Sequence, residues 1–451
     1  MTICRSTRRF VGLQFGAIWD PASCFLRSPA KQALRSQPIP QMVEPTACHS
    51  VQNPVFARGE SMTAAIPVLP IRYYDRMPPR AIRVLLLADT HLGIDLPERP
   101  RIVRRRRGDD FFANYGRALR PALAGEVDLV VHGGDVFFRS RVSPQLVMRA
   151  FEPLKRIADA GVPVVVVPGN HERSAIPYPL LAAHPRIHII DRPRTVTLIL
   201  EGIHVALAGF PCERRDVRSS FADLVERTGW GNAPADIRLL CLHQSVEGAT
   251  VGPVDYVFRG GDPDVISGNA IPPGFAAVLA GHIHRHQVLT SDLSRRALAA
   301  PVFYPGSIER TSTAERDEDK GYLIIEIDPD PATGGHVRSW TFHRLPARPM
   351  IDVELGPDDW SAGIVEEHIR RHLAALPQDA IVRLRLTDDL PALMRFPLTA
   401  KRVRALAPST MNVEVTESRA RGSASPPRTP MRRTSLPDQR SLNWNGPGVA
   451  G

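Results

Sequence analysis

The feature that most constrains the fold is a set of three continuous apolar runs. They read IRVLLLA over 82–88, DLVVH over 128–132 and VPVVVVP over 162–168. Apolar residues at both odd and even positions are typical of strands that are buried on both faces. The intervening segments 109–123 and 144–160, the second preceded by the N-cap residue Ser143, have the pattern of helices. This alternation predicts an α/β fold built from layered sheets.

The rest of the chain continues the pattern and indicates how it divides. Further strands are expected at 195–200, 204–208, 238–243, 276–280, 302–304, 322–327 and 337–342. After Pro349 a shorter β-α-β-α-β pattern predicts a small second α/β domain. We expect a main domain at 80–348 and a small domain at 349–417. Residues 1–79 are expected to be an extension that is disordered or precedes the true start codon, and 418–451 a disordered basic tail.

The net charge of +10 is a property of the two ends of the chain. Residues 1–80 carry ten Lys and Arg against four Asp and Glu, and 418–451 carry six Arg against Asp438. In 81–417, 41 basic residues face 42 acidic ones, which leaves a net charge of −1. A nucleic-acid interface on the main domain would therefore depend on local patches, such as the arginines at 104–107.

Composition also excludes several classes of protein. No apolar run approaches the roughly 20 residues that cross a bilayer, so we expect no membrane association. The five cysteines form no CxxC pair, which argues against a disulfide framework and favours a reducing, cytoplasmic compartment. With 43% hydrophobic residues, the chain can bury the core of a soluble globular protein.

Polar motifs stand where the predicted strands end. The motifs are ADTHLG, HGGD and PGNHE after the first three strands, and LHQ and AGHIHRH after two later ones. Because ligand sites in such sheets lie at the carboxyl ends of strands, we expect these five loops to converge on one rim. The side chains that they would bring together are Asp89, His91, Asp135, Asn170, His171, His243, His282 and His284.

These residue types indicate a pair of transition-metal ions. Residues i and i+2 of an extended segment point the same way, so Asp89 and His91 can aim two groups at one place. Mixed nitrogen and oxygen donors suit divalent first-row metals, whereas the excess of histidine argues against calcium and magnesium. Two such ions sharing a carboxylate would activate water and hold the oxygens of an in-line displacement at phosphorus.

The series DTH, GGD, GNHE, LHQ and GHIH resembles the calcineurin-like metallophosphoesterases. Within that superfamily the chain looks most like the branch of the bacterial SbcCD nuclease subunit and its DNA repair relatives. YPGSIERT and the following AERDEDKGYLIIEI are similar to the closing strands of that branch. The resemblance implies a layered β-sandwich core flanked by helices, a small capping-type domain, and exonuclease or endonuclease activity on DNA.

By position, the resemblance implies two metal ions, commonly manganese in this family, and one catalytic histidine. One ion would be held by Asp89, His91, Asp135 and His284, and the other by Asp135, Asn170, His243 and His282. Asp135 would therefore bridge the two ions. His171 would position the phosphate or protonate the leaving oxygen, which suits an imidazole, and Glu172 is expected to orient it.

One position departs from the pattern of this branch. Its nucleases usually carry a histidine three residues after the bridging aspartate, and that position is Phe138 here. A phenylalanine can neither donate to a phosphate nor carry a proton. Two alternatives to a DNA nuclease therefore stay open: a phosphatase or phosphodiesterase acting on nucleotides or other small phosphoesters, and a non-catalytic DNA-binding scaffold.

The resemblance also implies partners. DNA is the first candidate partner, and a second copy of the chain, in a homodimer, is a candidate as well. The nuclease subunit of the branch docks an ATPase through a C-terminal helical segment. An SbcC-like ATPase is therefore a second candidate partner, although the sequence after Glu417 has no amphipathic helical pattern.

Overall fold

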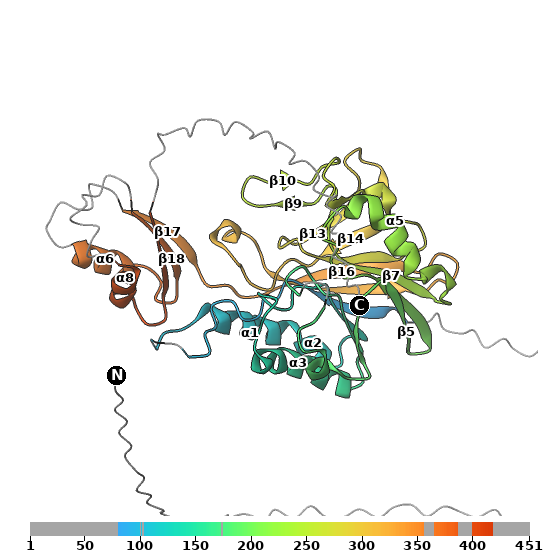
Figure 1. The fold of residues 1–451 in the computed structure, drawn as a ribbon, viewed down its shortest axis with the longest axis horizontal. Helices are drawn as coiled ribbons and strands as arrows, with labels where there is room; N and C mark the ends of the chain where they lie inside the picture. The colour runs from blue at the N-terminus through green and yellow to red at the C-terminus, as the bar shows by residue number, and fades with distance from the viewer. Residues whose placement is uncertain are drawn as a thin grey trace, which may run out of the picture. The chain divides into compact units, whose positions relative to one another are not determined.

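The computed structural model describes residues 80–99, 101, 103–172, 175–355, 365–386 and 399–417. The predictions for 1–79 and 418–451 lie outside these described residues. Two six-stranded sheets pack face to face, with helices on their outer faces, and a separate three-stranded sheet follows (Figure 1). The α/β class and the layered sheets that the sequence predicts are confirmed.

The first sheet has the strand order β16-β15-β1-β2-β3-β4. Strands β1 to β4 are parallel, whereas β15 pairs antiparallel with both β1 and β16. Because β1, β2 and β3 are parallel, the loops that follow them leave the same edge of the sheet. The bounds are β1 (Ile82–Leu87), β2 (Leu129–His132), β3 (Val164–Val166), β4 (Ile187–Ile189), β15 (Gly321–Asp328) and β16 (His336–Arg344).

The second sheet has the order β13-β14-β12-β7-β6-β5. Its four middle strands are parallel, and β5 and β13 close the edges antiparallel. The bounds are β5 (Arg194–Leu200), β6 (Ile203–Gly209), β7 (Ile237–His243), β12 (Ala277–Gly281), β13 (Gln287–Ser291) and β14 (Ala297–Tyr304). Between β7 and β12, four two-residue strands form two small pairs: β8 (Ser245–Val246) with β11 (Val265–Ile266), and β9 (Thr250–Val251) with β10 (Tyr256–Val257).

Helices cover the outer face of each sheet (Figure 1). The predicted helix over 109–123 forms two helices, because Pro121 lacks the amide hydrogen that a continuous helix needs. The cap at Ser143 is confirmed, since its side chain accepts from the Leu146 amide at 3.3 Å. No described helix is both long and apolar enough to cross a bilayer. The bounds are α1 (Arg107–Ala118), α2 (Arg120–Leu123), α3 (Pro144–Asp159), α4 (Pro179–Ala182) and α5 (Val217–Arg227), with short 3₁₀ turns at Trp230–Asn232, Gly268–Ala270 and Thr313–Glu315.

Strand β1 shows why the apolar runs are continuous. Its residues Ile82, Val84 and Leu86 belong to the apolar cluster between the two sheets. Leu85 and Leu87 point the other way, into the cluster under α1 and α3. Both faces of the strand are therefore covered, as the sequence predicts.

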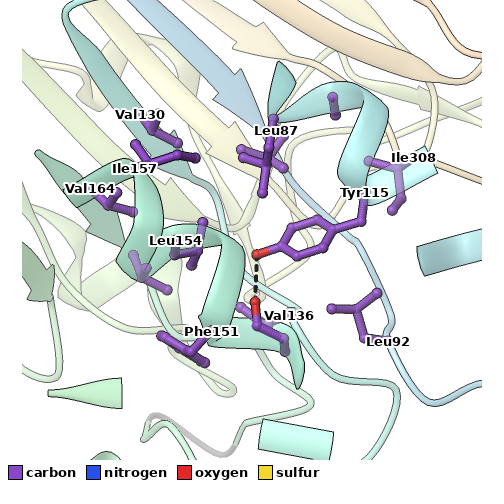
Figure 2. Close-up of a cluster of buried hydrophobic side chains, with 14 of the residues drawn as sticks. Leu87, Leu92, Tyr115, Val130, Val136, Phe151, Leu154, Ile157, Val164 and Ile308 are labelled. Atoms are coloured by element: carbon purple, nitrogen blue, oxygen red, sulfur yellow. Dashed lines mark hydrogen bonds between the residues drawn. The ribbon is translucent and has the colours of Figure 1, made fainter. Parts of the chain in front are cut away.

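In the cluster under the helices, the buried hydroxyl group of Tyr115 has a hydrogen-bond partner. The Tyr115 hydroxyl donates to the carbonyl oxygen of Ala150 at 3.0 Å, which links α1 to α3 (Figure 2). The remaining side chains of the cluster are aliphatic or aromatic, as Figure 2 shows for Leu87, Phe151 and Leu154. A buried hydroxyl with a partner avoids the desolvation cost of an unpaired one, so this bond fixes how the two helices meet.

The small domain has a core of its own. Its parallel strands have the order β17-β18-β19 and pack against two helices, as the β-α-β-α-β pattern predicts. Buried Ile369, Leu373 and Val403 join the helices to the sheet. The exact division of the chain into domains stays a prediction. The bounds are β17 (Met350–Leu355), α6 (Val365–Ala374), β18 (Ile381–Leu386), α8 (Ala400–Leu406) and β19 (Asn412–Glu417).

Candidate metal centre

The five polar loops converge at the carboxyl ends of β1, β2, β3, β7 and β12. Backbone hydrogen bonds join the first two loops, from the Asp89 amide to Gly134 O at 2.9 Å and from the His91 amide to Asp135 O at 3.0 Å. The His282 amide donates to both carboxylate oxygens of Asp89, at 3.0 and 3.2 Å, which adds the loop after β12. All eight residues singled out from the sequence lie at this one place.

Unusual backbone conformations aim several of these side chains. Asp89, His91, Asp135 and His282 have positive φ angles of 50°, 42°, 51° and 84°. Such angles are uncommon for residues other than glycine and are costly unless the surrounding structure imposes them. Their concentration in one cluster indicates that the fold holds the cluster in place at the expense of local strain.

The close approach of the backbone to Asp135 requires a glycine at position 169. A Cβ atom at Gly169 would lie 2.2 Å from Asp135 Oδ1 and 2.4 Å from the Asp135 backbone nitrogen. The loop after β3 can therefore pass beside the Asp135 carboxylate only because residue 169 has no side chain.

A first group of donors consists of Asp89, His91 and His284. The Nε2 atoms of His91 and His284 are 3.0 Å apart. Asp89 Oδ1 lies 4.0 Å from His91 Nε2 and 3.8 Å from His284 Nε2. One carboxylate oxygen and two imidazole nitrogens thus face a common point.

A second group lies on the other side of Asp135. His243 Nε2 is 3.4 Å from Asp135 Oδ2 and 3.1 Å from Asn170 Oδ1. His282 Nδ1 is 3.0 Å from the same Asn170 oxygen. Because Asp135 Oδ2 is also 3.9 Å from His91 Nε2, this carboxylate stands between the two groups.

The donor set fits a pair of divalent cations. Ligand atoms bound about 2.1 Å from one ion lie roughly 3.0 to 3.5 Å from each other, and the distances in both groups are close to this range. Asp89 and Asp135 are 0% and 2% exposed, and no described Lys or Arg pairs with either carboxylate. Buried carboxylates need a positive partner, and imidazole with carboxylate is a typical transition-metal donor set. The cluster is therefore a plausible site for two metal ions.

The pKa values of the cluster also favour bound cations. Burial raises the pKa of Asp89. Burial opposes ionisation of Asp135 as well, yet the charge of the neighbouring His243 imidazole holds the pKa of that carboxyl below its usual value. Burial would lower the pKa of His243, but Asp135 and Asp89 together raise it to about 9. The buried carboxylates thus strongly favour positive charge beside them.

His171 lies at the edge of the cluster and is 30% exposed. Its Nε2 is 3.8 Å from Asp135 Oδ2, and its Nδ1 donates to the carbonyl oxygen of Phe138 at 2.6 Å. A carbonyl can only accept, so Nδ1 carries the hydrogen and Nε2 presents its lone pair. The expectation that Glu172 orients His171 is wrong, because the buried Glu172 carboxylate accepts from the amides of Phe137 and Gly169 instead.

Sequence reasoning missed the residues behind His284. Glu315 Oε1 lies 3.0 Å from His284 Nδ1, and its other oxygen pairs with the Lys320 ammonium at 2.8 Å. Lys320 is fully buried and also donates to Glu318 at 2.9 Å and to the His284 carbonyl at 2.8 Å. The only signal was the acidic segment AERDEDKG just before β15, whose charges point to no particular histidine.

The arginines at 104–107 are not a free patch. Each guanidinium donates to a group within the chain, although the Arg105 side chain stays 40% exposed, so part of the charge of this run is engaged in internal contacts. The acceptors are Met411 O at 2.6 Å for Arg104, Asp110 at 2.5 Å for Arg105, Asp95 for Arg106 and Arg310 O for Arg107.

Fold, site and family comparison agree on the class of protein. Residues 82–286 match the model of the calcineurin-like phosphoesterase family. These residues form a calcineurin-like metallophosphoesterase domain, and the chain has the α/β fold of that class, with two mixed sheets flanked by helices. The class that the motifs of the sequence resemble is thereby confirmed.

Known relatives narrow the branch. The DNA double-strand break repair protein Mre11 of Haloferax volcanii is 28% identical over 309 residues, which are 68% of this chain and 62% of that protein. The Halobacterium salinarum protein of the same name is 28% identical over 313 residues, 68% of this chain and 71% of its own. Among solved structures, a dimetal phosphatase from Danio rerio is 14% identical, covers 58% of this chain and 99% of its own, and has a TM-score of 0.35. This metallophosphoesterase is a distant homologue of the Mre11 repair proteins.

Proposed function

We propose that this protein hydrolyses phosphodiester bonds in DNA with the help of two metal ions. The observation that carries the proposal is the position of Asp135, whose carboxylate stands between two groups of buried and half-buried donors. The distant homology to Mre11 proteins supports DNA as the substrate. Manganese is the ion we propose for both positions.

The residues of the chain would divide the work as follows. Asp89, His91 and His284 would hold one ion, Asn170, His243 and His282 would hold the other, and Asp135 would contribute its carboxylate to both. When bound, two such ions supply Lewis-acid activation of a water molecule and charge stabilisation at the phosphate. The loop after β12 keeps the Asp89 carboxylate in place, because the His282 amide of that loop donates to both of its oxygens.

His171 is the proposed catalytic histidine. Its Nδ1–H is fixed by the Phe138 carbonyl, which directs Nε2 towards the Asp135 carboxylate and the solvent side of the cluster. An imidazole placed there can position the phosphate or, when protonated, give a proton to the leaving oxygen. Its partial exposure leaves room for a substrate to approach.

A second candidate function is the hydrolysis of smaller phosphodiesters, such as those of nucleotides. The observation that favours it is the half-buried Phe138 ring, whose centre is 6.3 Å from that of His91 and 6.0 Å from that of His171. A ring at this place offers no proton donor to a long DNA backbone, but it can pack against a base.

One experiment separates the two functions. The full-length protein is incubated with Mn²⁺ and with linear duplex DNA, single-stranded DNA or bis(p-nitrophenyl) phosphate, and Asp135→Asn is the control. Release of nucleotides from DNA that Asp135→Asn abolishes is the expected result. Hydrolysis of the aryl ester without hydrolysis of DNA would refute the nuclease and favour the second function. Binding of Mn²⁺ without hydrolysis of any substrate would favour a scaffold.

A further inference from the structure

A cavity of about 700 Å³ lies beside the metal centre. Its walls come from the loop after β1, with Leu92 and Gly93, from the segment before α3, with Phe138 and Val142, and from the first turn of α3, with Leu146. Leu92 directly follows the predicted ligand His91 in the sequence. Because Phe138 lines the cavity while its carbonyl holds His171, the cavity and the site share a wall.

Three exposed arginines surround this cavity: Arg139, Arg141 and Arg149. Within the described part of the chain, no carboxylate lies within ion-pair distance of any of the three. Two of them rest on aromatic rings, since the Arg139 guanidinium carbon is 5.6 Å from the centre of the Phe138 ring and that of Arg149 is 3.7 Å from the centre of Phe112. A ring can hold a guanidinium in place and leave its hydrogen-bond donors free.

The opposite wall is different in charge. Arg106 on that wall is already paired with Asp95, and Glu98 is exposed to solvent. The free positive charge of the cavity is therefore concentrated on the side of Phe138. Unpaired guanidinium groups bind phosphate with two parallel hydrogen bonds, so this side favours a phosphate ligand.

We propose that this cavity binds the nucleoside and the phosphate next to the bond that is cleaved. The base stacks on Phe138, and Arg139 and Arg141 bind the flanking phosphate. The inference rests on the proposed phosphodiesterase function and names the part of the substrate that Phe138 and its neighbours recognise. It also gives Phe138 a role. This residue stands where the repair nucleases usually carry a histidine, and its ring is a stacking surface for the base.

Size and chemistry support a nucleoside over a bare phosphate. A volume of about 700 Å³ lies within the range of about 300 to 1,000 Å³ that small-molecule sites occupy. Leu92, Val142 and Leu146 form apolar walls that a phosphate alone would not contact. Stacking of a base on an aromatic ring tolerates any base, so the site predicts little preference for sequence.

The test compares two chromogenic esters with the full-length protein and Mn²⁺. One is the p-nitrophenyl ester of thymidine 5′-monophosphate, which carries a nucleoside, and the other is bis(p-nitrophenyl) phosphate, which does not. The variants are Phe138→Ala and the double variant Arg139→Ala/Arg141→Ala. The matched control removes two exposed arginines that do not line the cavity, Arg120→Ala/Arg186→Ala.

We expect the ratio of kcat/KM for the thymidine ester to that for the aryl ester to fall at least about fivefold in Phe138→Ala, the lower limit for one stacked base. The arginine double variant should lower the same ratio, and the control should not. An unchanged ratio in both cavity variants would overturn the proposal. A fall in the control as large as in the double variant would attribute the effect to net charge and overturn it as well.

A second measurement keeps this proposal separate from the proposed function. Binding of a fluorescent oligothymidylate is followed by anisotropy in the presence of EDTA, where no hydrolysis occurs. Weaker binding by both cavity variants than by the control supports the cavity even if the protein hydrolyses neither ester. Equal binding by all variants would refute it even if hydrolysis is observed.

Discussion

Glu315→Gln is expected to weaken the binding of one of two Mn²⁺ ions by about 10- to 100-fold, the usual effect of losing the group that orients a ligating histidine. In the structure Glu315 Oε1 lies 3.0 Å from His284 Nδ1, so that Nε2 faces Asp89 and His91. Glutamine keeps the shape of the side chain and an acceptor oxygen. It loses the negative charge, and a hydrogen bond to a charged acceptor is about twice as strong as one to a neutral acceptor.

The same change should leave the protein folded. Removing one partner from a buried ion pair costs about 3 to 5 kcal/mol when the other is left without any partner. The Lys320 ammonium keeps Glu318 at 2.9 Å and the His284 carbonyl at 2.8 Å. We therefore expect the free energy of unfolding to fall by less than about 3 kcal/mol.

The assay is isothermal titration of Mn²⁺ into metal-free full-length protein, with electron paramagnetic resonance to count bound ions. Glu318→Gln is the matched control, because it removes the other carboxylate from Lys320 and does not touch His284. The expected result is weaker binding of one ion in Glu315→Gln and near-normal binding in Glu318→Gln. Equal affinities in Glu315→Gln and the wild type, or equal losses in the two variants, would refute the reasoning.

Four further predictions test the site and the core. Gly169→Ala would place a Cβ atom 2.2 Å from Asp135 Oδ1, so we expect hydrolysis to fall about 100-fold, as for a ligand displaced by 1 Å. Gly116→Ala, which meets no atom within 4 Å, should instead raise the free energy of unfolding by about 0.5 to 1 kcal/mol in urea titrations. Tyr115→Phe removes the hydroxyl that bonds to Ala150, and the same titrations should show a loss of about 1 kcal/mol. Dialysis against EDTA should abolish hydrolysis and lower Tm, and added Mn²⁺ should restore both. Activity that survives complete removal of metal would contradict the metal centre.

The sequence by itself determined most strands of the two sheets, though not the edge strands β4 and β13, and it determined which eight residues meet at the candidate site. The reason is that short, local stretches of sequence specify both. Strands buried on both faces must be apolar throughout, and each polar motif follows its strand directly, so topology carries it to the common edge. The segment from Asp89 to His91 is not extended as the sequence argument assumed, because both residues have positive φ angles, yet their side chains still face a common point.

Only the tertiary structure decided what stands behind and beside those residues. Glu315 meets His284 across 31 positions, a distance along the chain at which no local pattern specified this partner. The same holds for the Phe138 carbonyl, which takes the place expected for Glu172 next to His171. The arginines at 104–107 look like a free basic run in the sequence, yet folding gives each guanidinium an acceptor. Whether a charge is free depends on which groups the fold brings within about 3 Å, and that is a property of the packed molecule.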